Sequence, residues 1–205
     1  MYLELLDRAS FFASLYALDV EIGREVQARG CGYCGGPLHV GHYQRRPRGL
    51  RFELERAWLL RLSYSCGREG CRRRTTPVSV RFFGRKVYAA VAFVLLSAQA
   101  TGPLTNRLLG EIERGVGTSV ETLRRWRGWW RDRFVPGRFW RQMRARFSPP
   151  VPEQGSIAAS ILGRFGAAGD EPAVERCLRF VAPAAGGVEA ESTMGRRAVH
   201  PARRR

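Results

Sequence analysis

Residues 31–36 read CGYCGG and residues 66–71 read CGREGC, so two pairs of cysteines stand 31 residues apart. A C-x2-C turn lets two thiolates bind the same metal ion at about 2.3 Å. The glycines beside each pair let the backbone turn beneath the sulfur atoms. Although the second pair is more widely spaced, two such pairs joined by candidate strands predict a zinc ribbon with a tetrahedral structural Zn²⁺. The predicted ligands are Cys31, Cys34, Cys66 and Cys71.

Other interpretations of the cysteines stay open. They could be buried or reactive free thiols, or a redox pair, although no thioredoxin-like βαβ pattern surrounds them. His39 and His42 follow the first pair and could replace one thiolate, or lie at the surface. Four thiolates leave no coordination position for water, so we expect a structural rather than a catalytic centre. Cys177 falls on the apolar face of a helical pattern and is expected in the core.

Around the ribbon the sequence predicts an α+β protein that is mainly helical. Residues 52–64 are rich in Trp, Leu and Tyr, which is typical of strands. The apolar stretch 87–100 is expected to be a buried helix, because a bilayer span needs about 20 residues. We expect residues 1–29 and 148–182 to pack as helices against the central core. The predicted segments are N-terminal helices 1–29, zinc ribbon 30–86, helix-turn-helix domain 87–147, linker and C-terminal helices 148–182, and a disordered basic tail 183–205.

A helix-turn-helix motif is predicted in the third segment. Apolar residues repeat every fourth position from Leu104 to Val116, and the glycines at 115 and 117 turn the chain. Residues 118–121 read TSVE, a capping box in which Thr118 caps the next helix. That helix is basic, and the second helix of such a motif enters the major groove of DNA.

A helical wheel assigns roles to the side chains of the second helix. Thr122, Arg124 and Arg125 are early and outward-facing, so we expect them at base edges. Arg127 and Arg131 flank the apolar stripe and are expected to reach phosphates. The stripe places Trp126 and Trp130 in the core, whereas Trp129 lies off it and is expected to pack against Trp140. The alternative is an arginine-rich surface helix without a ligand.

The charge of the chain lies in its middle. The 205 residues carry 35 basic and 18 acidic side chains, a net charge of +17. Residues 31–90 contribute +10 and residues 91–150 contribute +7, while the two ends cancel. Such charge attracts nucleic acid or anionic membrane. Within the ribbon, the arginines expected along phosphates are Arg45, Arg46, Arg48, Arg72, Arg73 and Arg74.

This order of elements is similar to a known family. A zinc ribbon, then RRRTTP (72–77), RFFGRK (81–86) and a Trp-containing arginine helix, resembles the N-terminal DNA-binding region of insertion-sequence transposases and the short orphan proteins associated with mobile elements. The resemblance covers about residues 30–147. It implies that the four cysteines are ligands, that the helix from Ser119 reads DNA, and that a transposase or recombinase is a candidate partner. Such transposases continue into a nuclease domain, for which the 58 residues after Phe147 are too few.

The expected function is therefore that of a cytoplasmic, zinc-containing protein that binds double-stranded DNA, as a mobile-element regulator, accessory factor or truncated transposase. No membrane contact is expected. The sequence contains no G-x-x-x-x-G-K-[ST], H-E-x-x-H or G-x-S-x-G motif, so we assign no reaction and expect no enzyme. Three alternatives remain: a transposase or nuclease subunit completed in trans, an RNA-binding zinc-ribbon protein, and an interaction module whose charge is compositional.

Overall fold

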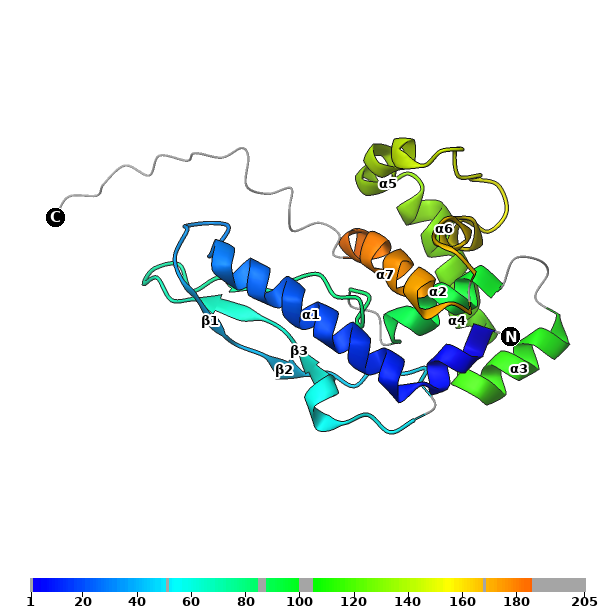
Figure 1. Ribbon diagram of the computed structural model, residues 1–205, viewed down its shortest axis with the longest axis horizontal. Coiled ribbons are helices and arrows are strands. Elements are labelled where there is room, and N and C mark those ends of the chain that lie inside the picture. Colours follow the sequence, from blue (N-terminus) through cyan, green and yellow to red (C-terminus); the bar gives the residue numbers. More distant parts are fainter. Residues whose placement is uncertain (1, 51, 85–87, 100–104, 168, 186–205) are drawn as a thin grey trace.

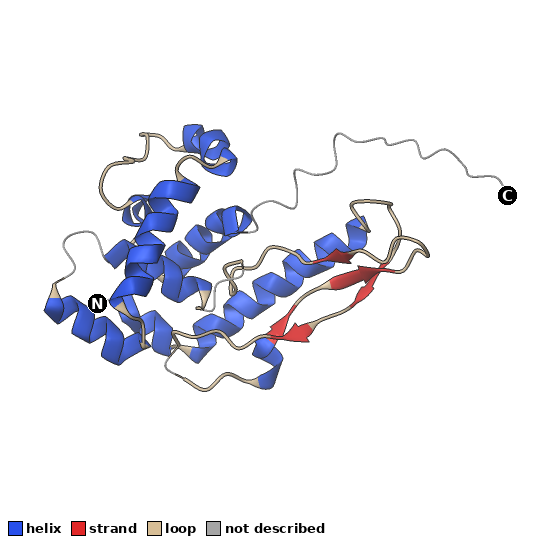
Figure 2. Ribbon diagram, turned by 180° about the vertical axis from the view of Figure 1, so that it is seen from behind, coloured by secondary structure: helices blue, strands red, loops and turns tan. Residues whose placement is uncertain are grey.

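The computed structural model describes residues 2–50, 52–84, 88–99, 105–167 and 169–185 (Figure 1). The fold is α+β, as predicted, and mainly helical. A narrow β-ribbon lies along the long helix α1, and the other helices gather toward the N-terminal end of α1 (Figures 1 and 2). The molecule therefore has a helical body and a ribbon joined by one helix.

The N-terminal segment connects the two parts. The 3-10 helix η1 (Tyr2–Asp7) leads into α1 (Ala9–Arg29), which ends at Gly30 with φ +77°. Glycine reaches this left-handed region without strain, so the chain can turn directly into Cys31. Phe11 and Leu15 of α1 are buried in the helical body, whereas Gly23, farther along, packs against Tyr64 of the ribbon.

Among the described residues, five short strands build the ribbon. Strands β1 (Leu38–Val40), β4 (Tyr64–Cys66) and β5 (Arg74–Thr75) form an antiparallel sheet in the order β1-β4-β5, with Leu38 opposite Cys66. Strands β2 (Tyr43–Gln44) and β3 (Leu60–Arg61) form a second antiparallel pair.

The expectation of strands throughout residues 52–64 is only partly correct. Residues 56–59 form the 3-10 helix η2 (Arg56–Leu59), and residues 52–55 have no strand. The aromatic side chains explain the difference, because Phe52 and Trp58 pack against Phe12 of α1 at ring distances of 6.0 and 6.2 Å. These rings are therefore part of the helical core rather than of a sheet.

Helix α2 (Ala90–Gln99) is the centre of the helical body, and Ala90 to Ala98 are all buried. The helices α4 (Val120–Trp129), α6 (Ile157–Phe165), α7 (Glu171–Ala185) and η1 pack around it. The expected packing of residues 1–29 and 148–182 onto a central core is confirmed. α7 continues to Ala185 and so includes the first three residues of the predicted tail 183–205; residues 186–205 lie outside the described residues.

Helix α3 (Asn106–Val116) precedes α4, with Gly117 in the left-handed conformation between them. Leu104, the first residue of the predicted apolar repeat, lies outside the described residues. A π-helical turn, η3 (Trp130–Phe134), continues α4, and α5 (Arg138–Met143) and the 3-10 turn η4 (Arg144–Arg146) follow.

A buried ion pair fastens α1 to the end of the ribbon. Asp19 Oδ2 lies 2.8 Å from Arg81 Nε, and the two side chains are 1% and 0% exposed. Asp19 also accepts hydrogen bonds from the hydroxyl of Ser79 and the backbone N–H of Val80, and Arg81 donates to the carbonyl of Leu60. Burial lowers the pKa of the Arg81 guanidinium. Buried charges persist only when their hydrogen-bonding capacity is met, as it is here.

Candidate metal centre and nucleic-acid interface

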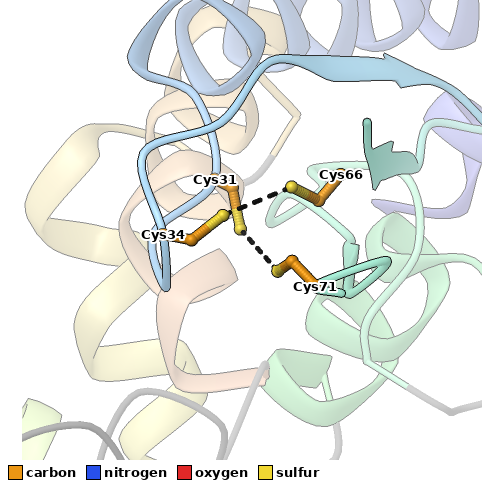
Figure 3. Close-up of side chains that lie close together, drawn as sticks. All are labelled: Cys31, Cys34, Cys66 and Cys71. Carbon is orange, nitrogen blue, oxygen red and sulfur yellow. Dashed lines mark hydrogen bonds between the residues drawn. The ribbon is translucent and has the colours of Figure 1, made fainter. Parts of the chain in front are cut away.

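Two loops bring the four predicted cysteine ligands together. The Sγ atoms of Cys31, Cys34, Cys66 and Cys71 all lie within 4.8 Å of one another, and the side chains converge from two turns (Figure 3). The Cys34–Cys66 and Cys31–Cys71 sulfur distances are 3.4 and 3.9 Å. Tetrahedral coordination with bonds of about 2.3 Å needs sulfur–sulfur edges of roughly 3.8 Å. These thiols could therefore hold a metal ion.

Local hydrogen bonds shape both turns. Cys31 donates its backbone N–H to Gly36, and Gly35, with φ +70°, donates back to the Cys31 carbonyl. A side chain at Gly36 would come within 3.2 Å of the Cys66 sulfur, so glycine leaves space there for the cluster. Arg68 of the second turn donates to the carbonyl of Cys34 at 2.8 Å, which ties the two turns together.

The two turns differ in their electrostatics. Backbone N–H groups of Tyr33 and Cys34 lower the pKa of the Cys31 thiol to about 6, because they stabilise the thiolate. Burial raises the pKa of the Cys66 thiol to about 12. A thiolate is the metal-binding form, so Cys31 is the more readily ionised ligand, and metal binding at Cys66 must displace its proton.

The histidines considered as substitute ligands do not join the cluster. His42 Nδ1 lies 3.1 Å from the backbone nitrogen of Ser63, and its ring packs edge-on against Tyr64. His39 is exposed and its ring covers Gly67. The fifth cysteine, Cys177, is buried in the helical core as predicted, and burial raises its pKa to about 12.

The ribbon arginines fall into two groups. Arg45 departs from the expected placement, because it is half-buried, donates to the carbonyl of Gly84 at 2.6 Å and lies over the ring of Phe82. Its guanidinium holds the loop to the ribbon rather than facing a ligand. The other predicted ribbon arginines are exposed: Arg46, Arg48, Arg72, Arg73 and Arg74.

Two of the exposed arginines lie on tyrosines that no sequence motif marks as functional. The Arg73 guanidinium is 3.7 Å from the ring centroid of Tyr33, and that of Arg74 is 5.7 Å from Tyr43. Each pair joins residues far apart in the sequence. In the sequence, the only indication of these tyrosine–arginine contacts is that each tyrosine belongs to the ribbon segment that also carries the arginine clusters.

The exposed face of α4 differs from the predicted face at one position. Arg124 and Arg125 are exposed, as predicted. The expectation that Thr122 faces outward is wrong, because it is only 6% exposed and its hydroxyl accepts a hydrogen bond from Arg125 at 2.8 Å. Thr122 therefore orients Arg125 instead of facing a ligand directly.

The cap of α4 is also shifted by one residue. Ser119, not Thr118, accepts the backbone N–H of Thr122 at 3.3 Å. Thr118 is buried, and its hydroxyl has no hydrogen-bond partner within the part of the chain that the structure describes. The predicted capping box is therefore wrong, because Ser119 rather than Thr118 is the N-cap residue of α4.

Substitution of the two hydroxyl residues is expected to separate their roles. Ser119→Ala removes the cap and should destabilise the protein by about 1 kcal/mol. Thr118→Val removes a buried hydroxyl without a partner and should be neutral or stabilising. Urea unfolding of both variants measures this difference. A larger decrease in the free energy of unfolding for Thr118→Val than for Ser119→Ala would show that Thr118 is the cap.

Arg127 lies farther along α4, Arg131 lies in the π-helical turn η3 that continues it, and both are exposed. Both line a cavity of about 290 Å³ together with the first turn of α6. Arg131 pairs with Asp132 at 2.6 Å, which raises the pKa of the arginine and lowers that of the carboxyl. The wheel predicted that both arginines flank the apolar stripe, and both are exposed and line this cavity beside the buried Trp130 of that stripe.

The tryptophans are structural. Trp126 and Trp130 are buried as predicted. The expected contact of Trp129 with Trp140 is not the observed packing. The ring centroid of Trp129 lies 5.0 Å from that of Phe83 and 5.4 Å from that of Phe93. The indole N–H of Trp140 donates instead to Glu153 at 2.7 Å. The rings fix α4 against α2 and leave its arginines at the surface.

Comparisons with protein-family models, with curated proteins and with solved structures gave no match. Among the described residues, no helix combines the length and apolar character that crossing a membrane requires.

Proposed function

We propose that this chain is a zinc-containing protein that binds double-stranded DNA through α4. The observation that carries the proposal is the exposed pair Arg124 and Arg125 early in a helix that is capped by Ser119 and follows α3 after a three-residue turn. A helix-turn-helix motif presents the N-terminal residues of its second helix to base edges in this way. Arginine reads guanine through two hydrogen bonds in the major groove.

Zinc is the metal that suits the thiol cluster best. Four thiolates in tetrahedral arrangement select zinc or an iron–sulfur cluster, and two turn-borne pairs in a small ribbon are typical of structural zinc. The metal would hold the two turns and thereby position the ribbon arginines. It supplies no chemistry of its own, because four protein ligands complete its coordination.

Phosphate contacts would complete the interface. Exposed cations that can neutralise phosphates are Arg127 on α4, Arg131 on the turn η3 that continues it, and Arg46 and Arg48 on the ribbon. Phosphate contacts position a protein on DNA without reading sequence. We extend the proposal to a regulator or accessory factor of a mobile element, which the resemblance of residues 30–147 supports. A transposase gene beside this gene is the expected genomic finding.

Duplex binding is tested with the double variant Arg124→Gln/Arg125→Gln. Duplexes are first selected from a random pool by the wild-type protein. The double variant should bind these selected duplexes at least tenfold more weakly than the wild type does, because each bidentate arginine contact contributes about 1–3 kcal/mol of discrimination. Affinity for unselected duplex should fall much less. Fluorescence anisotropy at several salt concentrations measures both, and the wild-type affinity should fall steeply with salt.

Arg179→Gln is the matched control for this experiment, because Arg179 is exposed on α7, away from α4. It removes one charge and should leave sequence preference unchanged. If the control lowers affinity as much as the double variant does, or if the pool yields no preferred sequence, α4 is not the reading helix.

A further inference from the structure

We propose that the cavity between η3 and the first turn of α6 binds a small monocarboxylate that carries an apolar group. The carboxylate meets the N-terminal end of α6, and the apolar group lies against the side chains of Trp130 and Ile157. This assigns a ligand site that the proposed function does not contain. It can be measured without nucleic acid.

Helices from three parts of the chain form the walls of this cavity of about 290 Å³. Ser97 belongs to α2, Trp130 to η3 and Ile157 to α6, and α6 packs against both of the other elements. Val135 and Ile157 make the walls largely apolar, while the exposed Arg131 at the edge shows that the cavity opens to the surface. A preformed cavity with apolar walls and a few polar groups is typical of sites for small organic molecules.

Two polar groups of these walls lack a hydrogen-bond partner among the described residues. They are the indole N–H of Trp130 and the hydroxyl of Ser97, and each of the two residues is only 3% exposed. A buried polar group without a partner is costly, so its presence in a folded protein indicates a bound molecule or ion that completes it. An indole can only donate, so the missing partner of Trp130 is an acceptor.

The first turn of α6 supplies further donors to the same cavity. Ser156 caps this helix by accepting the N–H of Ala159 at 3.3 Å. The N–H groups of Ile157 and Ala158 have no acceptor within the helix, and both residues line the cavity. The hydroxyl of Ser156 donates to the carbonyl of Ser97 at 3.1 Å, which places Ser97 beside this turn. The N-terminal end of a helix favours an anion, because its N–H groups and its dipole both attract negative charge.

The charges around the cavity fit one negative charge. Arg127, Arg131 and Glu153 line the cavity. Outside it, Asp132 pairs with Arg131 at 2.6 Å and Arg144 pairs with Glu153 at 3.1 Å. Three arginines and two carboxylates leave a net charge of +1. A carboxylate neutralises this charge, whereas a phosphate dianion brings more negative charge than the site offers.

The experiment uses the full-length, zinc-loaded protein with benzoate as the probe. NMR correlation spectra of the indole N–H groups report binding at Trp130, whose signal is identified by its loss in Trp130→Phe. Benzoate should shift this signal saturably, because the indole N–H gains an acceptor. Benzamide lacks the charge and acetate lacks the ring, so each should bind at least about tenfold more weakly than benzoate does.

Variants of the lining residues are compared by isothermal titration calorimetry. Trp130→Phe keeps an aromatic ring but removes the donor, and should weaken benzoate binding by about tenfold. Ser97→Ala should weaken it by about 2- to 10-fold without lowering the thermal stability of the unliganded protein, because the hydroxyl has no partner in the described structure. Arg131→Gln should weaken it by about 2- to 5-fold, since this guanidinium is exposed.

Arg133→Gln is the matched control, because Arg133 is exposed on the same turn and does not line the cavity. It removes the same charge and should bind benzoate within about twofold of the wild type. An unshifted Trp130 signal up to the solubility limit of benzoate would overturn the proposal, as would equal losses in Arg131→Gln and Arg133→Gln. Benzamide binding as tightly as benzoate would also overturn it, and tighter binding of phenyl phosphate would exclude a carboxylate as the preferred ligand. None of these measurements involves a duplex, so this site and the proposed DNA binding can fail separately.

Discussion

Replacing Cys66 with serine is expected to abolish metal binding and to unfold the ribbon while the helical body stays folded. The reason is the composition of the ribbon's own core, which consists of Cys31, Leu38, Tyr64 and Cys66, with Val26, Cys34 and Cys71 packed around it. Most of that core is the proposed ligand set. Structural zinc in small domains contributes about 10–16 kcal/mol of apparent binding free energy, far more than so few apolar side chains can supply. Cys66→Ser removes a buried ligand from this centre.

Metal content by mass spectrometry and hydrogen exchange of the backbone amides measure the two effects. Zinc should fall from near one equivalent to near zero, and amides of β1 and β4 should lose protection while those of α2 keep it. Cys177→Ala is the matched control, because this buried thiol belongs to the helical core. It should retain zinc. A Cys66→Ser protein with full zinc content, or a wild type without metal that keeps a protected ribbon, would contradict the assignment.

Loss of the Asp19 carboxylate is expected to destabilise the whole protein by about 3–5 kcal/mol. Asp19→Ala leaves Arg81 buried without its counter-ion, and the cost of an uncompensated buried charge is of that size. Hydrogen bonds of the pair join α1 to the segment 79–81 and to the carbonyls of Trp58 and Leu60, so all three regions should loosen together. The double variant Asp19→Leu/Arg81→Met removes both charges and should recover part of the loss.

Urea unfolding followed by circular dichroism measures these changes. The control is Glu171→Gln, which breaks the pair with Arg8. That pair has the same 2.8 Å separation, but its side chains are 49% and 34% exposed. An exposed pair contributes about 0–1 kcal/mol. Equal destabilisation by Asp19→Ala and Glu171→Gln would show that burial of the Asp19–Arg81 pair has no special role.

Local patterns in the sequence predicted local features of the structure. Two short cysteine spacings were enough to predict the clustered thiols, because each turn is fixed by its own glycines. The apolar repeat of α4 correctly placed Trp126 and Trp130 in the core and Arg124 and Arg125 at the surface. Because the α-helix has a fixed period, its buried and exposed faces can be predicted from the sequence without knowing which elements pack against it.

Features that depend on distant neighbours were not predictable in this way. The burial of Thr118 and Thr122 follows from how the start of α4 meets the rest of the body, and periodicity alone does not report that contact. The roles of Arg45 and Arg81 depend on partners 39 and 62 residues away. An arginine in a basic stretch of sequence is expected at the surface. Arg81 is instead among the most buried side chains of the described residues.

Helix α1 belongs to both parts of the molecule. Phe11 and Leu15 in its first half are buried in the helical body, Gly23 in its second half packs against Tyr64, and one glycine separates its end from Cys31. Because one continuous helix contacts both parts, the ribbon is not a module on a flexible linker. The exposed arginines of the ribbon and of α4 therefore keep one relative orientation, and a duplex that contacts both must match that fixed arrangement of cations.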